Sequence, residues 1–191
     1  MEGIVAMLYI SLSYFVGAIL FAVIVGKVKG IDLQSANSGN LGARNAGRTL
    51  GKGAFVVVAV GDGLKGLVVV LAGRLLDYSE LTIALAVIAV IVGHLYPFWN
   101  KGKGGKGVAT IVGAMVMFAP LTFLVFLLGF GVSIVLTKSA TISMVIAFVM
   151  YGILLIMQFS AVGSVFAMAL LLVIWKQRKS IIERVMPNVL E

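Results

Sequence analysis

Long apolar runs recur along almost the whole chain and leave only short polar segments between them. An α-helix of about 20 apolar residues crosses the roughly 30 Å of hydrocarbon in a bilayer, because it rises about 1.5 Å per residue. Hydrophobic residues make up 61% of the 191 residues and charged residues only 12%, whereas a soluble domain carries about 25% charge. We therefore predict an all-α polytopic membrane protein with one transmembrane domain over residues 1–191. Its expected spans are about 4–26, 54–71, 81–98, 107–118, 121–136, 140–157 and 161–175.

The number of spans depends on the apolar segment 107–136. As one helix it would be about 45 Å long, which exceeds the bilayer core, and Pro120 is suited to end one helix and begin another. A division there gives seven transmembrane helices, with the N-terminus outside and the C-terminus cytoplasmic. Most of the 15 basic residues then lie in cytoplasmic segments, whereas six spans would place Lys138 and the basic C-terminus outside. The positive-inside rule therefore favours seven spans with glycine-rich cytoplasmic loops.

Composition also limits the chemistry. The chain has no cysteine, one histidine and seven carboxylates, and its formal net charge is +8. Disulfides and thiolate catalysis are excluded, and few groups remain for a protein-built metal site. The positive charge favours anions such as lipid headgroups, phosphates or carboxylates.

Two cytoplasmic loops, 32–53 and 100–107, combine glycine with asparagine and basic side chains. Glycine lets backbone N–H groups converge into a nest that binds anions, and lysine and arginine add positive charge. A helix that opens at Gly107 also favours phosphate at its N-terminus. Alternatively, the basic residues only enforce topology. The candidate phosphate ligands are Ser38, Gly39, Asn40, Gly42, Arg48, Lys101, Lys103, Gly104, Gly105, Lys106 and Gly107.

Further polar groups lie within or beside apolar runs. Asp62 and Lys65 in "VGDGLKG" share one helix face, and charges at membrane depth face a cavity or each other. They either serve a site or form a structural ion pair. His94 is either a hydrogen-bonded anchor near the interface or a group that titrates near neutrality. Ser143 follows Lys138 in a segment typical of a short polar turn.

Three stretches carry a resemblance to a known family. They are "SGNLGARN" (38–45) followed by Arg48, "DGLKG" (62–66) and "GHLYPFWNKGKGGKGVAT" (93–110). Together they resemble motifs of the bacterial acyl-phosphate:glycerol-3-phosphate acyltransferases (PlsY), and the third motif is long and specific. The similarity covers the chain from about Asp32 to Thr110.

The resemblance implies a multi-pass enzyme of the bacterial inner membrane with a cytoplasmic site. Such an enzyme moves an acyl chain from acyl phosphate to the 1-hydroxyl of glycerol 3-phosphate, which gives lysophosphatidic acid and phosphate in phospholipid synthesis. Because acyl phosphate is already activated, no covalent nucleophile, metal or cofactor is expected. The expected partners are the two substrates and membrane lipids, with no nucleic acid. The candidate catalytic residues are Asn45, His94 and Lys106, and the proton of the attacking hydroxyl passes either to a phosphate oxygen of the donor or to His94.

The C-terminal tail departs from the family pattern. The family usually carries H-x-x-N-I-x-R-L after the last helix, whereas this chain reads "WKQRKSIIERVMPN". Gln177 and Ser180 stand near the expected histidine and asparagine. Two alternatives remain open, a carrier for a phosphate-bearing anion and a non-catalytic relative that binds lipid precursors. The supporting site residues are Asp62, Lys65, Ser143, Gln177 and Ser180.

Overall fold

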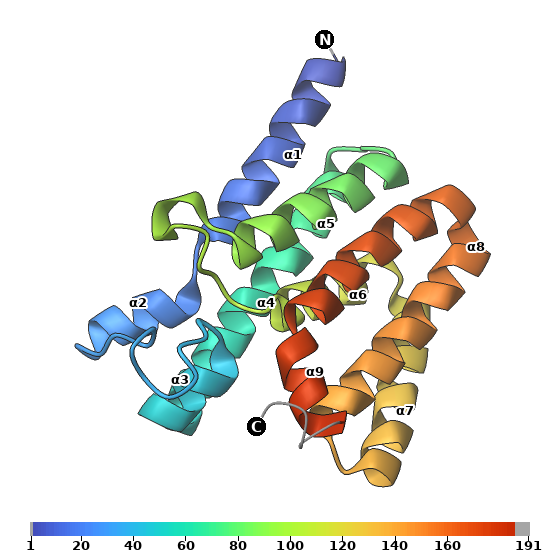
Figure 1. Cartoon of the computed structure of the whole chain (residues 1–191). Coiled ribbons are helices and arrows are strands. Elements are labelled where there is room, and N and C mark those ends of the chain that lie inside the picture. Colours follow the sequence, from blue (N-terminus) through green and yellow to red (C-terminus); the bar gives the residue numbers. More distant parts are fainter. Residues whose placement is uncertain (1, 186–191) are drawn as a thin grey trace. The chain divides into compact units, whose positions relative to one another are not determined.

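A computed structural model of the chain describes residues 2–185, apart from the side chain of Glu2. All regular structure in this described part is helical (Figure 1). The described residues divide into two compact units, 2–117 and 118–185. The first unit contains α1 (Glu2–Ala18), α2 (Phe21–Val28), α3 (Ala43–Leu50), α4 (Lys52–Leu75), α5 (Glu80–Leu95), the 3₁₀ turn η1 (Phe98–Asn100) and nearly all of α6 (Val108–Phe118). The second contains α7 (Pro120–Thr137), α8 (Ala140–Lys176) and α9 (Arg178–Val185).

The helices confirm the prediction of an all-helical membrane protein. Within residues 2–185, five helical segments are long and apolar enough to cross a bilayer. The apolar α6 is shorter, as the sequence suggested. It ends at Phe118 and α7 begins at Pro120, so segment 107–136 does divide where proline fixes the first turn of a new helix. The five long segments are Gly3–Val28, Lys52–Leu75, Glu80–Asn100, Pro120–Thr137 and Ala140–Lys176.

The first of these segments is broken in the middle. The sequence predicts one span over 4–26, but the backbone is extended at Leu20 (φ −97°, ψ 107°) and separates α1 from α2. A break frees backbone carbonyls that need partners inside a membrane. The indole of Trp99 donates to the carbonyl of Ala18 at 2.8 Å, and Lys65 satisfies two neighbouring carbonyls. Groups distant in sequence therefore stabilise the break.

Glycines allow helix backbones in the first unit to touch. A Cβ on Gly66 of α4 would overlap the carbonyl of Thr110 in α6, and one on Gly113 of α6 would overlap the carbonyl of Gly63. A Cβ on Gly93 of α5 would likewise overlap the backbone of α1. The first two contacts fix α6 against the middle of α4, and the glycine-rich loop leads directly into α6.

A small apolar core holds the polar loops of the same unit. It joins α2, the loop after it, α3 and the start of α4, so the polar segment 32–53 has an ordered course. The buried members of this core are Leu20, Ala22, Leu33, Leu41, Ala46, Ala54 and Val58.

The long helix α8 folds back on itself within the second unit (Figure 1). Ser160 has non-helical angles (φ 45°, ψ −111°), and its position falls between the expected spans 140–157 and 161–175. A Cβ on Gly163 would overlap the backbone of Leu155, so the two limbs meet closely at the turn. The two expected spans therefore correspond to the two limbs of α8.

Aromatic side chains pack the second unit. The rings of Tyr151 and Phe166, one from each limb of α8, lie 6.0 Å apart. The ring of Phe126 in α7 stacks on that of Phe148 in α8 at 5.5 Å. The second unit therefore has an apolar interior of its own.

The α4–α6 contact generates a prediction on stability. Gly66→Ala should lower the free energy of unfolding by roughly 1–3 kcal/mol, because the new methyl group cannot fit against the α6 backbone. Thermal unfolding of the purified protein in detergent measures this change. Gly53→Ala in the same helix is the control, because no atom lies within 4 Å of its added Cβ. Equal melting temperatures for the two variants would contradict the close crossing.

Candidate functional site

The first glycine-rich loop is organised around the side chain of Asn45 in α3. This amide is 1% exposed, and its Nδ2 donates to the carbonyl of Leu33 at 2.8 Å. Its Oδ1 accepts from the backbone N–H of Ser38 at 3.3 Å and from the Ser38 hydroxyl at 3.2 Å. Asn45 therefore fixes the course of the loop from inside.

The other candidate ligands of this loop lie nearer its surface. Ser38 and Arg48 are exposed, whereas Gly39, Asn40 and Gly42 are half-buried. Gly39 has φ +65°, a conformation that favours glycine. The loop therefore presents the guanidinium of Arg48 to solvent from a fixed backbone, whereas the Ser38 hydroxyl bonds to Asn45. Guanidinium groups bind phosphate with paired hydrogen bonds.

The second glycine-rich loop lies against the end of α5. The backbone N–H groups of Gly104 and Gly105 donate to the carbonyls of Leu95 and His94, each at 3.1 Å. These two N–H groups are therefore occupied within the protein. A Cβ on Gly105 would overlap Nε2 of His94 and would lie 2.7 Å from the carbonyl oxygen of Leu41, which belongs to the first loop. The two loops therefore meet at Gly105.

The second loop also carries three lysines. Lys101 and Lys103 are exposed, Lys106 is half-buried, and Gly107 leads into α6 with φ +79°. Cations with three N–H donors each suit a phosphate as point charges.

A buried ionic cluster lies beneath the meeting point of the loops. The ammonium Nζ of Lys65 donates to the carbonyls of Gly17 at 3.1 Å and Ile19 at 2.8 Å, and it lies 2.8 Å from Nδ1 of His94. Oδ1 of Asp62 lies 2.9 Å from the same Nζ, at the distance of a charge-assisted hydrogen bond. The three protons of the ammonium thus face four acceptors within 3.1 Å, and Asp62 also balances the charge. The ion pair, one of the two alternatives for Asp62 and Lys65, is therefore present in the structure, whereas their role in a site stays a prediction.

The cluster occupies the break between α1 and α2. The backbone N–H of Phe21, the first residue of α2, donates to the Asp62 carboxylate. The negative group therefore lies at the positive N-terminal end of α2, and the Lys65 ammonium lies at the negative C-terminal end of α1. Asp62, Lys65 and His94 are 2%, 4% and 3% exposed, respectively.

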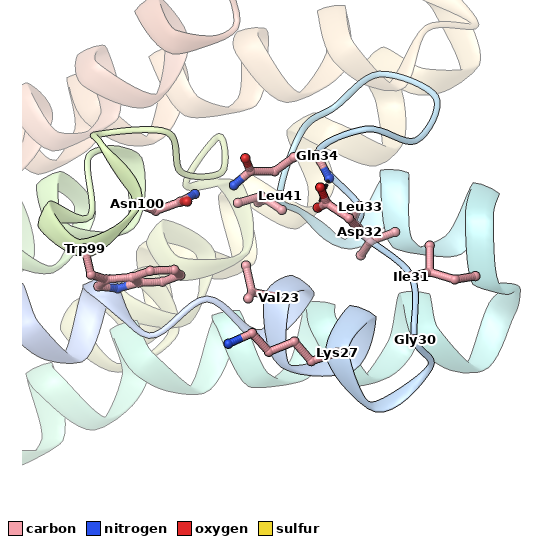
Figure 2. A pocket seen from close by; sticks show the side chains of 10 residues that line it. All are labelled: Val23, Lys27, Gly30, Ile31, Asp32, Leu33, Gln34, Leu41, Trp99 and Asn100. Carbon is pink, nitrogen blue, oxygen red and sulfur yellow. Dashed lines mark hydrogen bonds between the residues drawn. The ribbon is translucent and has the colours of Figure 1, made fainter.

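A cavity of about 500 Å³ opens between α2 and the two loops (Figure 2). Its walls combine apolar side chains with a few polar groups, among them Lys27 and Asn100, and it contains none of the predicted phosphate ligands. Sequence reasoning missed this cavity, because no local signal in the sequence places α2 beside Trp99. The lining residues are Val23, Lys27, Gly30, Ile31, Asp32, Leu33, Gln34, Leu41, Trp99 and Asn100.

The supporting residues of the second unit have local partners. The Ser143 hydroxyl is fully buried and lies 2.8 Å from the Thr137 hydroxyl, and it also donates to the carbonyl of Ser139. Gln177 is 5% exposed, and its Nε2 donates to the carbonyl of Val173 at 3.4 Å. Ser180 is half-buried on α9. Their role in a site stays a prediction.

The described residues contain no cluster of three or more histidine, cysteine or acidic groups able to hold a metal ion. Within the first unit, the structure brings His94, Gly105 and the carbonyl of Leu41 in the first loop together, with Lys65 against His94. The exposed cations of the two loops are suited to hold a phosphate-bearing molecule by charge.

Comparison with known proteins identifies the family of the chain. A profile of the family described as "Glycerol-3-phosphate acyltransferase" matches residues 7–187. Glycerol-3-phosphate acyltransferase 1 of Bacillus cereus is 45% identical over 112 residues, and the match covers 58% of this chain and 62% of that protein. The chain thus spans less than two thirds of that relative's length. Glycerol-3-phosphate acyltransferase of Bacillus subtilis is 43% identical over 137 residues, which cover 71% of this chain and 70% of that protein.

Solved structures agree as well. The crystal structure of PlsY, an integral membrane glycerol 3-phosphate acyltransferase, in its glycerol 3-phosphate form matches with a TM-score of 0.86 at 28% sequence identity. This match covers 96% of the present chain and 93% of that one. The lysophosphatidic acid form of the same enzyme matches with a TM-score of 0.84.

The buried amide of Asn45 generates a prediction. Asn45→Ala leaves the Leu33 carbonyl and the Ser38 N–H without their partner, so it should lower the free energy of unfolding by roughly 1–3 kcal/mol. Thermal unfolding in detergent measures the effect. Arg44→Ala, an exposed position on the same helix, is the control. If both variants melt at the same temperature, Asn45 does not hold the loop.

Proposed function

Because the chain belongs to the glycerol-3-phosphate acyltransferase family, we propose that it transfers an acyl chain from acyl phosphate to the 1-hydroxyl of glycerol 3-phosphate. The products are lysophosphatidic acid and inorganic phosphate. The observation that carries this proposal is the meeting of two basic, glycine-rich loops at Gly105, although they are far apart in sequence. Two phosphate-bearing substrates need such a surface, and the neighbouring apolar helices suit an acyl tail.

The proposed reaction needs no covalent intermediate on the protein. The hydroxyl oxygen of glycerol 3-phosphate attacks the acyl carbonyl carbon, and the bond from that carbon to the phosphate oxygen breaks. The departing phosphate takes up the hydroxyl proton, so atoms and charges balance. The chain contributes position and charge: Ser38 and Arg48 from one loop, and Lys101, Lys103 and Lys106 from the other, hold the phosphates. The burial of His94 against Lys65 supports the donor phosphate, rather than the imidazole, as the proton acceptor.

The tail residues receive a supporting role in this proposal. Gln177 and Ser180 would contact the acceptor in place of the histidine and asparagine usual in the family. Glutamine keeps hydrogen-bonding capacity but has no positive charge. We therefore expect weaker binding of glycerol 3-phosphate than in relatives with the usual tail.

We also propose seven membrane crossings in a bacterial inner membrane, with the N-terminus outside and the loops in the cytoplasm. The two limbs of α8 and the short α6 supply the crossings beyond the other long segments. The short α6 is accommodated by its close contact with α4 or by local thinning of the bilayer. The basic loops then lie on the inner side, as the positive-inside rule requires.

Cysteine labelling tests this topology directly, because the natural chain has no cysteine. A single cysteine at Lys101 or Lys179 should resist an impermeant thiol reagent added to intact cells. A cysteine at the exposed Asp77, between α4 and α5, should react and serves as the positive control. Rapid labelling at Lys101 from outside would overturn the orientation.

Purified protein supplied with acyl phosphate and glycerol 3-phosphate should release lysophosphatidic acid and phosphate in equal amounts. Arg48→Ala and Lys106→Ala should each lower kcat/KM about ten- to hundredfold, because each removes a charge-assisted hydrogen bond of roughly 1.5–3 kcal/mol. Steady-state kinetics with either substrate varied measures the loss.

Arg74→Ala is the matched control, since it removes a positive charge at the far end of α4. Unchanged kinetics in both loop variants would remove the phosphate assignment. Binding of both substrates without any product would instead favour a non-catalytic relative, and flux of glycerol 3-phosphate into proteoliposomes without donor would favour a carrier.

A further inference from the structure

The break between α1 and α2 contains a charge pair that matches both helix ends. Lys65 donates to the last carbonyls before the break, and Asp62 accepts the first N–H after it. Both side chains come from one turn of α4, so a single rigid helix fixes the end of α1 and the start of α2. Because α2 leads into the first glycine-rich loop, its placement determines where that loop begins.

The same cluster reaches the second loop through His94. Nδ1 of His94 lies 2.8 Å from the Lys65 ammonium, whereas Nε2 faces Gly105. The lysine ammonium has only protons to offer, so Nδ1 acts as the acceptor and the imidazole is neutral at this nitrogen. The backbone N–H of Gly105 also donates to the carbonyl of His94. One ring thus joins the lysine to the loop.

We propose that Asp62, Lys65 and His94 are positioning residues that set the spacing of the two phosphate-binding loops, and that His94 serves as a hydrogen-bond acceptor for Lys65. This inference rests on the proposed function, because only that function makes the two loops phosphate-binding. The contacts among the three residues do not depend on any substrate. It assigns one purpose to three buried polar groups that are costly at membrane depth. A spacing fixed in this way allows two phosphates to be held at reacting distance without a loop moving.

The role of an acceptor differs from that of a base in a way that mutation can reveal. In His94→Asn the amide oxygen lies close to the place of Nδ1 and still accepts from Lys65, but no imidazole remains to titrate. In His94→Ala both capacities are lost. A positioning role therefore predicts rescue by asparagine, whereas a catalytic base predicts equal loss in both variants.

Two measurements on the purified full-length protein test the proposal. The first is hydrogen–deuterium exchange of the peptides that cover 30–42 and 100–107, which needs no substrate. The second is the Kd for glycerol 3-phosphate by titration calorimetry. We expect Lys65→Met and His94→Ala to speed exchange of both loops and to raise Kd, each at least about tenfold, because a buried bonded group loses its partner. His94→Asn should recover both values to within about threefold of the natural chain.

Arg74→Met controls for the loss of one positive charge from α4 and should change neither measurement. If Lys65→Met does not yield folded protein, Lys65→Arg replaces it, since a planar guanidinium cannot meet the same acceptors and should also loosen both loops. Unchanged exchange in the lysine variant, or equal loss in the alanine and asparagine variants of His94, would overturn the proposal. Failure of the natural chain to bind glycerol 3-phosphate would contradict the proposed function. The comparison of hydrogen–deuterium exchange among the variants would still decide whether the three residues position the loops.

Discussion

The first unit depends on an ion pair inserted into a broken helix. A continuous membrane helix satisfies its own backbone, and a break exposes carbonyls and N–H groups that lipid cannot bind. Here Lys65 and Asp62 supply the missing partners with the charge sign that each helix end prefers. Removing two charges from water costs several kcal/mol per ion, and the helix ends, His94 and the mutual attraction offset that cost. The pair therefore permits a bend in the chain that apolar side chains alone would not sustain.

The sequence predicted part of the arrangement around the ion pair. The i, i+3 spacing predicted that Asp62 and Lys65 share a face, and the cost of buried charge left a structural ion pair as one of two alternatives. The sequence did not predict that Lys65 and Asp62 also bond to backbone groups at the α1–α2 break. The break at Leu20 contains neither proline nor a polar residue that would mark it. The break exists only because Lys65 and Trp99 arrive from distant segments, and such contacts leave no local pattern.

For the glycine-rich loops, too, the sequence predicted some features and the structure added others. Their glycine content predicted tight backbone turns and an anion-binding surface. In the structure, the N–H groups of Gly104 and Gly105 bond to the end of α5, and Gly105 is needed because no side chain fits between His94 and Leu41. Glycine composition alone cannot distinguish an N–H group that faces a ligand from one that faces a neighbouring helix. For Asn45, the family resemblance suggested a catalytic residue, which stays a prediction, and the structure adds that its buried side chain organises its own loop.

Helix α4 carries two different sets of residues, those that contact the backbone of α6 and those on its outer side. Gly66 faces the peptide groups of α6, whereas Val56, Val60 and Leu64 are about half exposed on the outer side of α4. The distance between the two helices is thus set by peptide groups, whose size does not vary with the sequence. The outer row is free to exchange one apolar side chain for another as a bilayer becomes thicker or more fluid. Adaptation to a new lipid environment and preservation of the glycine-rich loops can therefore proceed without interfering with each other.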